Sequence, residues 1–179
     1  MAIDGPLQAR IRPAGPDDAA ALALVAQATF LEAYAGLVQA ADIIAHCEVH
    51  NSAAAFRASL AEGSRAWLVE AVKTGAPLGF ALLTKSALPD PLDGDIELKR
   101  IYLLDRCQGQ GLAAELLDMV IAAATAAGHR RLVLGTNRDN ERALGFYRKT
   151  GFEVIGTRTF TVGTQQFDDY ILAKLLEFS

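Results

Sequence analysis

Cysteine is scarce in this 179-residue chain, which has only Cys47 and Cys107. Two cysteines are too few for a disulfide scaffold and suit a reducing compartment, so we expect a cytoplasmic protein. No apolar run approaches the roughly 18 residues that suggest a membrane-spanning helix, and residues 1–8 lack the apolar core of a signal peptide. We therefore expect no membrane association.

Positive charge is also in short supply, since 17 Lys and Arg face 21 Asp and Glu and give a formal net charge of −4. A nucleic-acid-binding protein normally presents a basic face, so we expect no nucleic-acid partner. A weakly negative field favours cationic small molecules instead. Hydrophobic residues make up 51% of the chain, which is enough for one globular core that needs no disulfide or metal ion for its stability.

The hydrophobic patterns predict a single domain over residues 1–179, with a mostly antiparallel mixed sheet flanked by helices, an α/β (α+β) fold. Residues 8–63 predict a short strand at 8–12, ended by Pro13, and helices from residue 16, at 39–50 and at 52–60. Residues 66–134 predict strands at 66–72, 78–84, 96–104 and 131–134, with a helix after Gly111. Residues 135–179 predict a helix ending at Lys149 and strands at 153–162 and 165–175.

The strand at 96–104 changes phase in its middle. Ile96 and Leu98 share one face, but the apolar alternation resumes at Ile101 and Leu103. One extra residue in a strand causes such a shift, so we predict a β-bulge near residues 99–100. The alternative is a fully buried strand with one charged interruption.

A glycine-containing loop, Arg106-Cys107-Gln108-Gly109-Gln110-Gly111, joins this strand to the next helix. Amide groups exposed where a helix begins form an anion site, for which a pyrophosphate is a natural occupant. A dinucleotide-binding fold would need an earlier β-α-β unit, and a Walker loop would need Gly-Lys-Ser/Thr; neither is present. An anion site would lower the pKa of the Cys107 thiol, but no histidine is an evident partner, so we interpret this cysteine as a bystander.

A second cluster, Asn140-Glu141-Arg142-Ala143-Leu144-Gly145-Phe146-Tyr147-Arg148-Lys149-Thr150-Gly151-Phe152, follows about thirty residues later. On a helix, Asn140, Ala143 and Tyr147 share one face because they lie three and four residues apart. The pattern therefore presents an amide and a phenol together, next to an apolar wall.

The two clusters together resemble the GNAT superfamily of acyl-CoA-dependent N-acetyltransferases. The loop matches the R/Q-x-x-G-x-G/A signature, and the second cluster is similar to the N-x-x-A-x-x-F-Y-x-K-x-G-F element, in the same order and at the right distance. The similarity covers roughly residues 96–175. Within the superfamily, bacterial polyamine (spermidine/spermine) N-acetyltransferases are the most similar, through Arg100-Ile101-Tyr102, Thr29-Phe30 with Tyr34, and Asp168-Asp169 with Lys174.

The resemblance implies that acetyl-CoA enters a V-shaped cleft where the strands at 96–104 and 131–134 splay apart. Its pantetheine arm would pair with Ile101, Tyr102 and Leu103, as an added strand does. Its pyrophosphate would lie on amide groups of the loop and helix start, with Arg106 as a cationic contact; these amides belong to Gln108, Gly109, Gln110, Gly111, Leu112 and Ala113. Asn140 would hydrogen-bond the arm and Lys149 would reach a phosphate, but a helix cap and a solvated charge are their plainer interpretations.

The resemblance also implies direct attack of a primary amine on the thioester. A free alkylamine has a pKa of about 10.4, so a base must remove its proton. Glu97 is the candidate base because it lies on the strand beside the expected thioester; a solvated strand residue is the competing interpretation. Tyr147 holds the family's general-acid position for the leaving thiolate, with a packed aromatic as the alternative. A backbone amide within residues 101–103 would stabilise the oxyanion.

We expect a small-molecule amine as acceptor, with a polyamine favoured, and no metal. His46 and His50 lie four residues apart on a helix, but no third ligand with recognised spacing accompanies them. Asp168 and Asp169 would attract a cationic amine or mark a solvated strand end.

Two other functions stay open: acetylation of a protein N-terminus or lysine, and a non-catalytic acyl-CoA sensor. A closed acidic pocket built on residues 31–60 would favour a polyamine, whereas an open groove would favour a peptide. Dimers are common in the superfamily, so the resemblance leaves a homodimer open.

Overall fold

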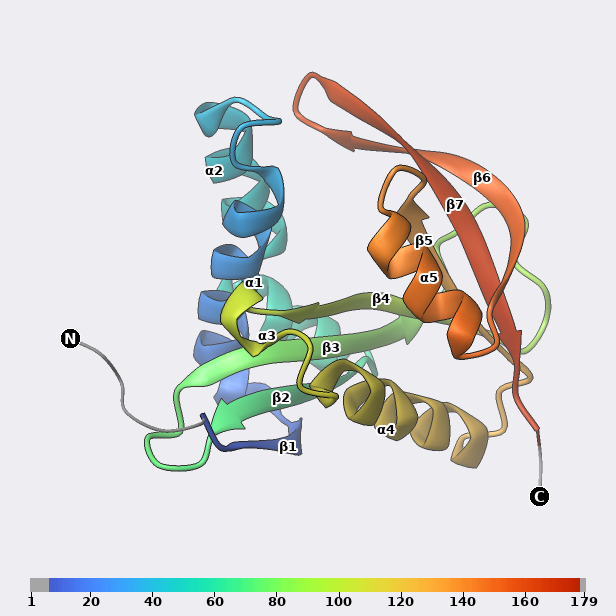
Figure 1. Ribbon diagram of the computed structural model, residues 1–179, viewed down its shortest axis with the longest axis horizontal. Coiled ribbons are helices and arrows are strands. Elements are labelled where there is room, and N and C mark those ends of the chain that lie inside the picture. Colours follow the sequence, from blue (N-terminus) through green and yellow to red (C-terminus); the bar gives the residue numbers. More distant parts are fainter. Residues whose placement is uncertain (1–6, 178–179) are drawn as a thin grey trace.

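The computed structural model describes residues 7–177, which form one seven-stranded sheet with helices on both faces (Figure 1). This is the mixed α+β fold that the hydrophobic pattern predicts. The elements in chain order are β1 (Ala9–Ala14), η1 (Pro16–Asp18), α1 (Ala19–Tyr34), α2 (Ala40–His50), α3 (Ala53–Ala61), β2 (Arg65–Ala71), β3 (Pro77–Lys85), β4 (Asp95–Leu103), η2 (Asp105–Cys107), α4 (Leu112–Ala126), β5 (Arg131–Asn137), α5 (Glu141–Lys149), β6 (Glu153–Val162) and β7 (Gln165–Leu175). Within these residues, no helix has the length and apolarity to cross a membrane.

Two clusters of buried side chains cover the two faces of the sheet. α1 and α3 pack on one face, where the rings of Phe56 and Phe80 meet edge-on at 5.8 Å. α4 and α5 cover the other face, where Leu116 and Leu144 belong to the larger cluster. Fully burying one such side chain contributes about 1.5–3 kcal/mol, so the two helix layers stabilise the sheet from both sides.

The strands lie in the order β1-β2-β3-β4-β5-β7-β6, and only the β4–β5 pair is parallel. That pair spans just three residues on each strand, from Asp95 opposite Arg131 to Glu97 opposite Val133. Its closed end is held by Arg131, whose Nε and Nη2 donate to the two carboxylate oxygens of Asp95 at 2.7 and 2.8 Å. Beyond Glu97 the two strands separate, while β5 stays paired with β7 as far as Asn137. The sheet therefore opens into a V.

The predicted β-bulge is present. Leu82 pairs with Arg100 and Leu83 pairs with Leu98, which leaves Lys99 without a partner in β3. A bulge bends its strand, and this one follows directly after the last β4–β5 pairing, so it helps β4 turn away from β5.

Two strands are longer than the sequence pattern predicted. β1 continues through Pro13 to Ala14, because it is an edge strand and one of its sides needs no amide donor. β5 continues past Leu134 to Asn137, because β7 pairs with it along its whole length although Thr136 and Asn137 are polar.

Gly79 lets β3 and β4 approach closely. A methyl group added there would lie 2.6 Å from the carbonyl oxygen of Tyr102 and would overlap Leu103. We expect Gly79→Ala to lower the free energy of unfolding by about 1–3 kcal/mol in urea denaturation, as overpacking does. Gly145→Ala is the control: nothing lies within 4 Å of its added methyl group in α5, so it should raise stability by about 0.5–1 kcal/mol. Equal effects of the two substitutions would contradict this account.

Candidate functional site

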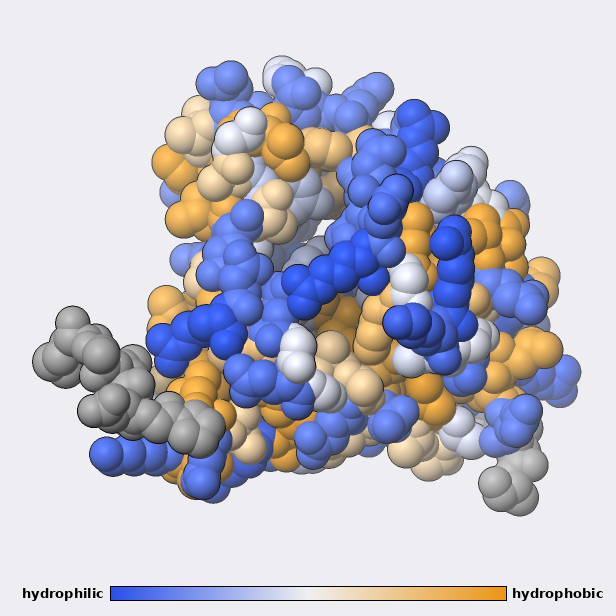
Figure 2. Space-filling model, in the orientation of Figure 1, coloured by the Kyte–Doolittle hydropathy of each residue, from blue (hydrophilic) through white to orange (hydrophobic). Residues whose placement is uncertain are grey.

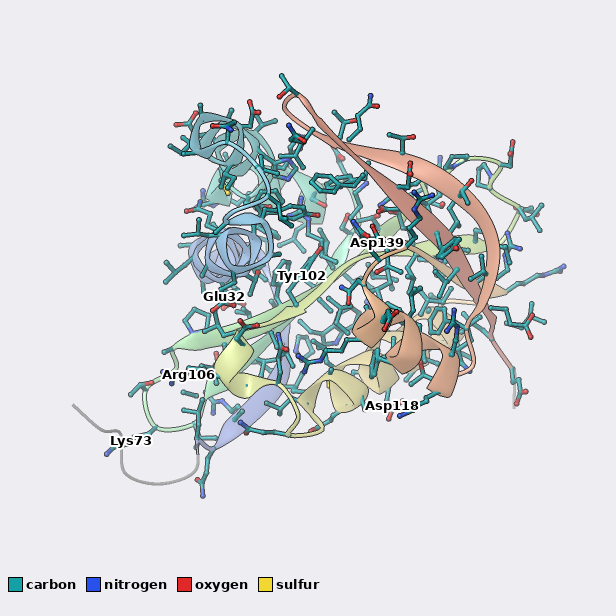
Figure 3. All side chains as sticks on the ribbon, turned by 45° about the horizontal axis from the view of Figure 1, so that its top comes forward. Glu32, Lys73, Tyr102, Arg106, Asp118 and Asp139 are labelled. Atoms are coloured by element: carbon teal, nitrogen blue, oxygen red, sulfur yellow. The ribbon has the colours of Figure 1, made fainter. Side chains whose placement is uncertain are left out.

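The open part of the V is a cleft of about 300 Å³. α1 and α2 form one wall and the strands beyond β5 form the other, and the space-filling view shows the surface hollowed between these two sides (Figure 2). Among the predicted site residues, Glu97 and Tyr102 line this cleft. Tyr102 projects from the far end of β4 toward α1 (Figure 3).

The β6–β7 hairpin covers the cleft. Its turn reaches the start of α2, where the amide and hydroxyl of Thr164 both donate to Asp42 Oδ2 at 3.4 Å. Below the turn, Val162 is fully buried against Phe30 and Ile43. The hairpin therefore bridges from the strand wall of the cleft to α2 through its turn.

Glu97 occupies the point where β4 and β5 part. Its side chain is only 2% exposed, so the interpretation as a solvated strand residue is wrong. Oε2 accepts a hydrogen bond from the amide of Ala87 at 2.8 Å, and Oε1 lies 3.9 Å from the ammonium group of Lys99. The carboxylate is therefore buried at the fork of the sheet, held by one amide and one nearby cation.

Tyr147 lies on α5 and is buried in the core cluster that α4 and α5 cover; it is not among the residues that line the cleft. Its ring packs edge-on against Phe146 and Phe152, with centroids 5.4 Å away in each case. Burial, and secondarily the nearby phenol of Tyr102, raises the pKa of Tyr147 above its usual value. The phenol is therefore protonated at neutral pH and is a hydrogen-bond donor, not a base.

The loop between β4 and α4 exposes a row of backbone amides. Gly109 and Gly111 adopt left-handed conformations with φ of 77° and 81°, and Gly111 begins α4 without any side-chain cap. As a result, the amide hydrogens of residues 109–113 have no acceptor in the part of the chain that the structure describes. Unpaired amides at a helix start are a ready anion site.

Side chains of the same loop hold its backbone in shape. Gln108 donates through Nε2 to the Leu103 carbonyl at 3.3 Å and to Asp105 Oδ1 at 2.9 Å. Gln110 donates through Nε2 to the Arg106 carbonyl at 3.1 Å. The glutamine side chains thus brace the loop. The backbone amide of Gln108 is also engaged, donating to the Asp105 carbonyl at 3.1 Å, so its predicted availability to an anion is wrong, whereas the amide of Gln110 stays free among the described residues.

The remaining predicted residues flank these two features. Ile101 and Leu103 lie on β4 beyond the bulge, on the stretch that β5 does not pair with. Arg106 is exposed in η2, at the outer end of β4 (Figure 3). Asn140 caps α5, its Oδ1 accepting from the Ala143 amide at 3.0 Å, which confirms the capping interpretation. Lys149 is exposed in the last turn of α5.

Cys107 differs from the expectation for an anion loop. The residue is completely buried, and burial raises the pKa of its thiol where an anion site would have lowered it. Its sulfur therefore stays protonated and packs as part of the core.

The two adjacent aspartates have different environments. Asp168 is exposed and pairs with Arg138 at 2.8 Å. Asp169 is 4% exposed and lines the cleft, where Arg158 Nε donates to it at 3.1 Å. Burial raises the pKa of Asp169, and Arg158 opposes that rise. Of the two sequence interpretations, the strand end fits Asp168 and the cleft fits Asp169.

Sequence reasoning missed Arg158 and Gly135, which also line the cleft. A methyl group on Gly135 would lie 2.5 Å from the guanidinium of Arg158, so the glycine makes the space that this arginine fills. No sequence motif marks these two residues, since one is an arginine among alternating threonines and the other a glycine in a short strand. They become neighbours through the pairing of β5, β6 and β7.

His46 and His50 do lie together, with ring centroids 4.6 Å apart on α2. His46 stacks on Phe30 at 4.3 Å with the planes only 6° apart. Burial, and then the charges of His50 and Arg100, lowers the pKa of His46 to about 4. Among residues 7–177, no three His, Cys, Asp or Glu side chains gather closely enough to hold a metal ion.

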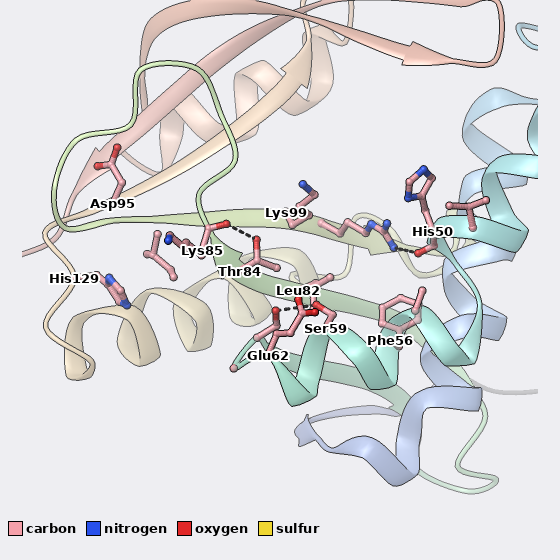
Figure 4. A pocket seen from close by; sticks show the side chains of 16 residues that line it. His50, Phe56, Ser59, Glu62, Leu82, Thr84, Lys85, Asp95, Lys99 and His129 are labelled. Carbon is pink, nitrogen blue, oxygen red and sulfur yellow. Dashed lines mark hydrogen bonds between the residues drawn. The ribbon is translucent and has the colours of Figure 1, made fainter.

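A second cavity, of about 550 Å³, lies between α3 and the strands β3 and β4 (Figure 4). Thr84, Lys85 and Glu62 line it, and it contains none of the predicted catalytic or cofactor-binding residues. His50, Lys99 and Arg100 line both cavities, so these three residues form the partition between them.

A sheet split beside a row of free amides is the architecture of an enzyme that admits an extended, phosphorylated cosubstrate. Residues 30–152 match the model of the acetyltransferase (GNAT) family, and the chain belongs to this family. Acetyl-CoA is accordingly its cosubstrate.

Individual relatives agree with this membership. An uncharacterized N-acetyltransferase of Mycobacterium tuberculosis is 38% identical over 159 residues, covering 89% of this chain and 98% of that protein. The L-methionine sulfoximine/L-methionine sulfone acetyltransferase of Pseudomonas aeruginosa is 30% identical over 89 residues, covering 50% of this chain and 51% of that one. The PaiA N-acetyltransferase of Thermoplasma acidophilum, solved with coenzyme A, has the same fold, with a TM-score of 0.75 at 21% identity over 94% of this chain and 99% of that one.

The lowered pKa of His46 predicts a pH-dependent stability. The unfolded chain binds this proton with a pKa near 6.5 and the folded chain with a pKa of about 4, so the unfolded state holds more protons between these values. We expect the free energy of unfolding to fall as the pH drops from about 6.5 to 4. His46→Phe keeps the stack on Phe30 and should remove about 1 kcal/mol of that fall, because the ring retains some solvent contact. Urea unfolding at pH 7, 5.5 and 4 measures it, and parallel pH profiles for the two proteins would disprove it.

Proposed function

We propose that this acetyltransferase transfers the acetyl group of acetyl-CoA to the primary amine of a small molecule, by direct attack in a ternary complex. The observation that carries the proposal is the row of unpaired amides at residues 109–113, next to the unpaired stretch of β4. The free strand edge is followed along the chain by the anion site. This order matches the pantetheine arm of the cosubstrate, which is extended and ends in a pyrophosphate.

The residues present fit this cosubstrate, which supplies an acetyl group activated as a thioester. The unpaired amides of residues 109–113 and the cation of Arg106 would hold the pyrophosphate. The open edge formed by Ile101, Tyr102 and Leu103 would pair with the pantetheine arm. Asn140 and Lys149 flank the opposite side of the V, on α5.

Proton transfer divides between a residue of β4 and a residue of α5. Glu97 would take the proton of the incoming ammonium group, since its carboxylate is buried in the cleft and bonded to only one amide. Tyr147 would donate to the leaving sulfur, because its raised pKa keeps the phenol protonated. An amide within residues 101–103 would stabilise the oxyanion.

The bridge between the hairpin and α2 supports a small acceptor over a protein chain. The contact between Thr164 and Asp42 joins the two walls of the cleft at the hairpin turn, which leaves less room for a polypeptide than a groove without this bridge would. The named Pseudomonas relative acts on small amino compounds, which agrees with this choice. A polyamine, implied by the sequence resemblance, stays a prediction: Glu97 and Asp169 would attract a polycation, whereas Lys99 and Arg100 would repel it. A cytoplasmic location and a homodimer likewise stay predictions.

Release of CoA thiol from acetyl-CoA tests the proposal, measured across spermidine, spermine, aminoglycosides, amino acids and short peptides. We expect turnover with at least one small amine and none with peptides. Binding of acetyl-CoA without turnover of any amine would favour the sensor function, and turnover confined to peptides would favour a protein acetyltransferase.

Gly111→Ala tests the anion site. Gly111 and Gly128 lie at opposite ends of α4 with φ of 81° and 82°, and nothing lies within 4 Å of a methyl group added to either. Both substitutions should cost about 1–2 kcal/mol of stability through the same left-handed strain. Only Gly111→Ala should weaken acetyl-CoA binding, by about tenfold in calorimetry, because it reorients the unpaired amides. Equal affinities of the two variants would remove this loop from the binding site.

Tyr147→Phe tests the general acid. We expect kcat to fall by about 100-fold while KM for acetyl-CoA changes little, because the ring still packs and only the proton donor is lost. Tyr170→Phe, in β7 on the core side, is the matched control and should leave both constants near their starting values. An unchanged kcat in Tyr147→Phe would exclude the phenol from the mechanism.

A further inference from the structure

We propose that the acceptor is an amine that also carries a carboxylate, and that Arg100 binds this carboxylate. The inference rests on the proposed function and narrows its substrate class. An apolar or aromatic amino acid is the simplest molecule with this combination of groups.

Arg100 differs from every comparable arginine in the described residues. Four arginines there are partly buried, and three of them pair with a carboxylate: Arg12 with Asp18, Arg131 with Asp95, and Arg158 with Asp169. No Asp or Glu of residues 7–177 lies within 4.0 Å of the Arg100 guanidinium. A partly buried cation without a counter-ion is costly, and a ligand anion would remove that cost.

The guanidinium is nevertheless held in one position. Nη1 donates to the side-chain oxygen of Asn51 at 2.7 Å and to the carbonyl oxygen of His50 at 3.1 Å, the latter drawn in Figure 4. Its flat group also lies over the Phe56 ring, 5.6 Å from the centroid. Neutral oxygens fix one edge, so the other donors stay available in a preorganised fork, the geometry that suits a carboxylate.

The neighbours of Arg100 add no negative charge to replace the missing partner. Burial and the charge of Arg100 lower the pKa values of His46 and His50, so both rings are neutral at pH 7. Lys99, the next residue, is a second cation at the same partition. Lys99 has Glu97 as a partner at 3.9 Å and Arg158 has Asp169, so among the cleft's cations within the described chain Arg100 is the one without a carboxylate partner.

The other end of the cleft suits an ammonium group. The carboxylate of Glu97 lies three residues before Arg100 along β4, and Asp169 of β7 lines the same cleft. Three strand residues span about 10 Å, so the two charged ends fall within reach of one small molecule and its side chain. An acceptor with both charges satisfies both ends, whereas a polyamine would bring a second cation toward Arg100.

Aromatic rings line the cleft between these ends. Phe30 and His46 stack face to face, and the Tyr34 and Phe160 rings lie beside them. Such a wall favours a flat or apolar side chain over a third charge. The structure therefore points to an apolar amino carboxylate and not to a polar or basic one.

Matched acceptors test the carboxylate directly. CoA-thiol release is measured with L-phenylalanine, L-phenylalaninamide, phenethylamine and spermidine on the full chain. We expect kcat/KM for L-phenylalanine to exceed that for the amide or the amine by about 100-fold. In Arg100→Gln that advantage should disappear, while the value for phenethylamine stays within about threefold. Arg100→Lys should recover part of the advantage, because it restores the charge without the fork.

Arg57→Gln, in which an exposed arginine of α3 is changed, should leave the preference intact. The midpoint of thermal unfolding and the affinity for acetyl-CoA should be the same in Arg100→Gln as in wild type, because a misfolded variant would show a lower midpoint and weaker binding. Equal turnover of carboxylate and non-carboxylate acceptors by wild type, or turnover of spermidine alone, would overturn the inference while the proposed function stands.

A binding measurement separates the two proposals if no amine is turned over. Calorimetry with CoA present compares N-acetyl-L-phenylalanine with N-acetylphenethylamine in wild type and Arg100→Gln. A preference of about 100-fold for the carboxylate, lost in the variant, supports the anion site even though acetyl transfer has failed. Equal affinities in wild type would refute it.

Discussion

The short pairing of β4 with β5 is the constraint on which the rest of this structure depends. Backbone groups inside a sheet normally satisfy one another, but here the pairing ends after three residues and each strand keeps an unsatisfied edge. The ion pair of Asp95 with Arg131 holds the strands together at the closed end, and the bulge at Lys99 turns β4 away at the open end. The cleft, the buried carboxylate of Glu97 within it and the free strand edge all follow from that geometry.

Enclosure explains why the charges in the cleft matter. Glu97 and Asp169 are buried and Arg100 is partly buried among the hairpin of β6 and β7 and the helices α1 and α2, so each charge acts at a lower effective dielectric than on the surface. Asp169 meets Arg158 and Glu97 faces Lys99. Among the charged residues described in the cleft, the guanidinium of Arg100 is the one that contacts neutral oxygens and no carboxylate. This side chain is therefore the most informative about which ligand the cleft binds.

Local signals in the sequence were sufficient to predict much of the fold and part of the candidate site. The phase change around Lys99 predicted the bulge, and the glycines at 109 and 111 predicted a helix start with free amides, because both depend on a few neighbouring residues. The end of β1 was wrong because Pro13 breaks a strand only where both edges are paired. The partners of Arg158 and Arg100 could not be predicted, because they come from strands and helices distant in sequence. The absence of a counter-ion also has no signal in the sequence itself.

Gly135 shows how a strand residue without chemistry can decide what the cleft holds. Arg158 rests where the β-carbon of any other amino acid would stand, 2.5 Å from its guanidinium. In a related protein with alanine or serine at this position, the arginine would have to leave Asp169, and a buried carboxylate would become free to face the ligand. Under the proposed amino-carboxylate specificity, one methyl group at this position would shift the preference of the pocket toward cationic acceptors, so divergence at this site is a short evolutionary route between acceptor classes.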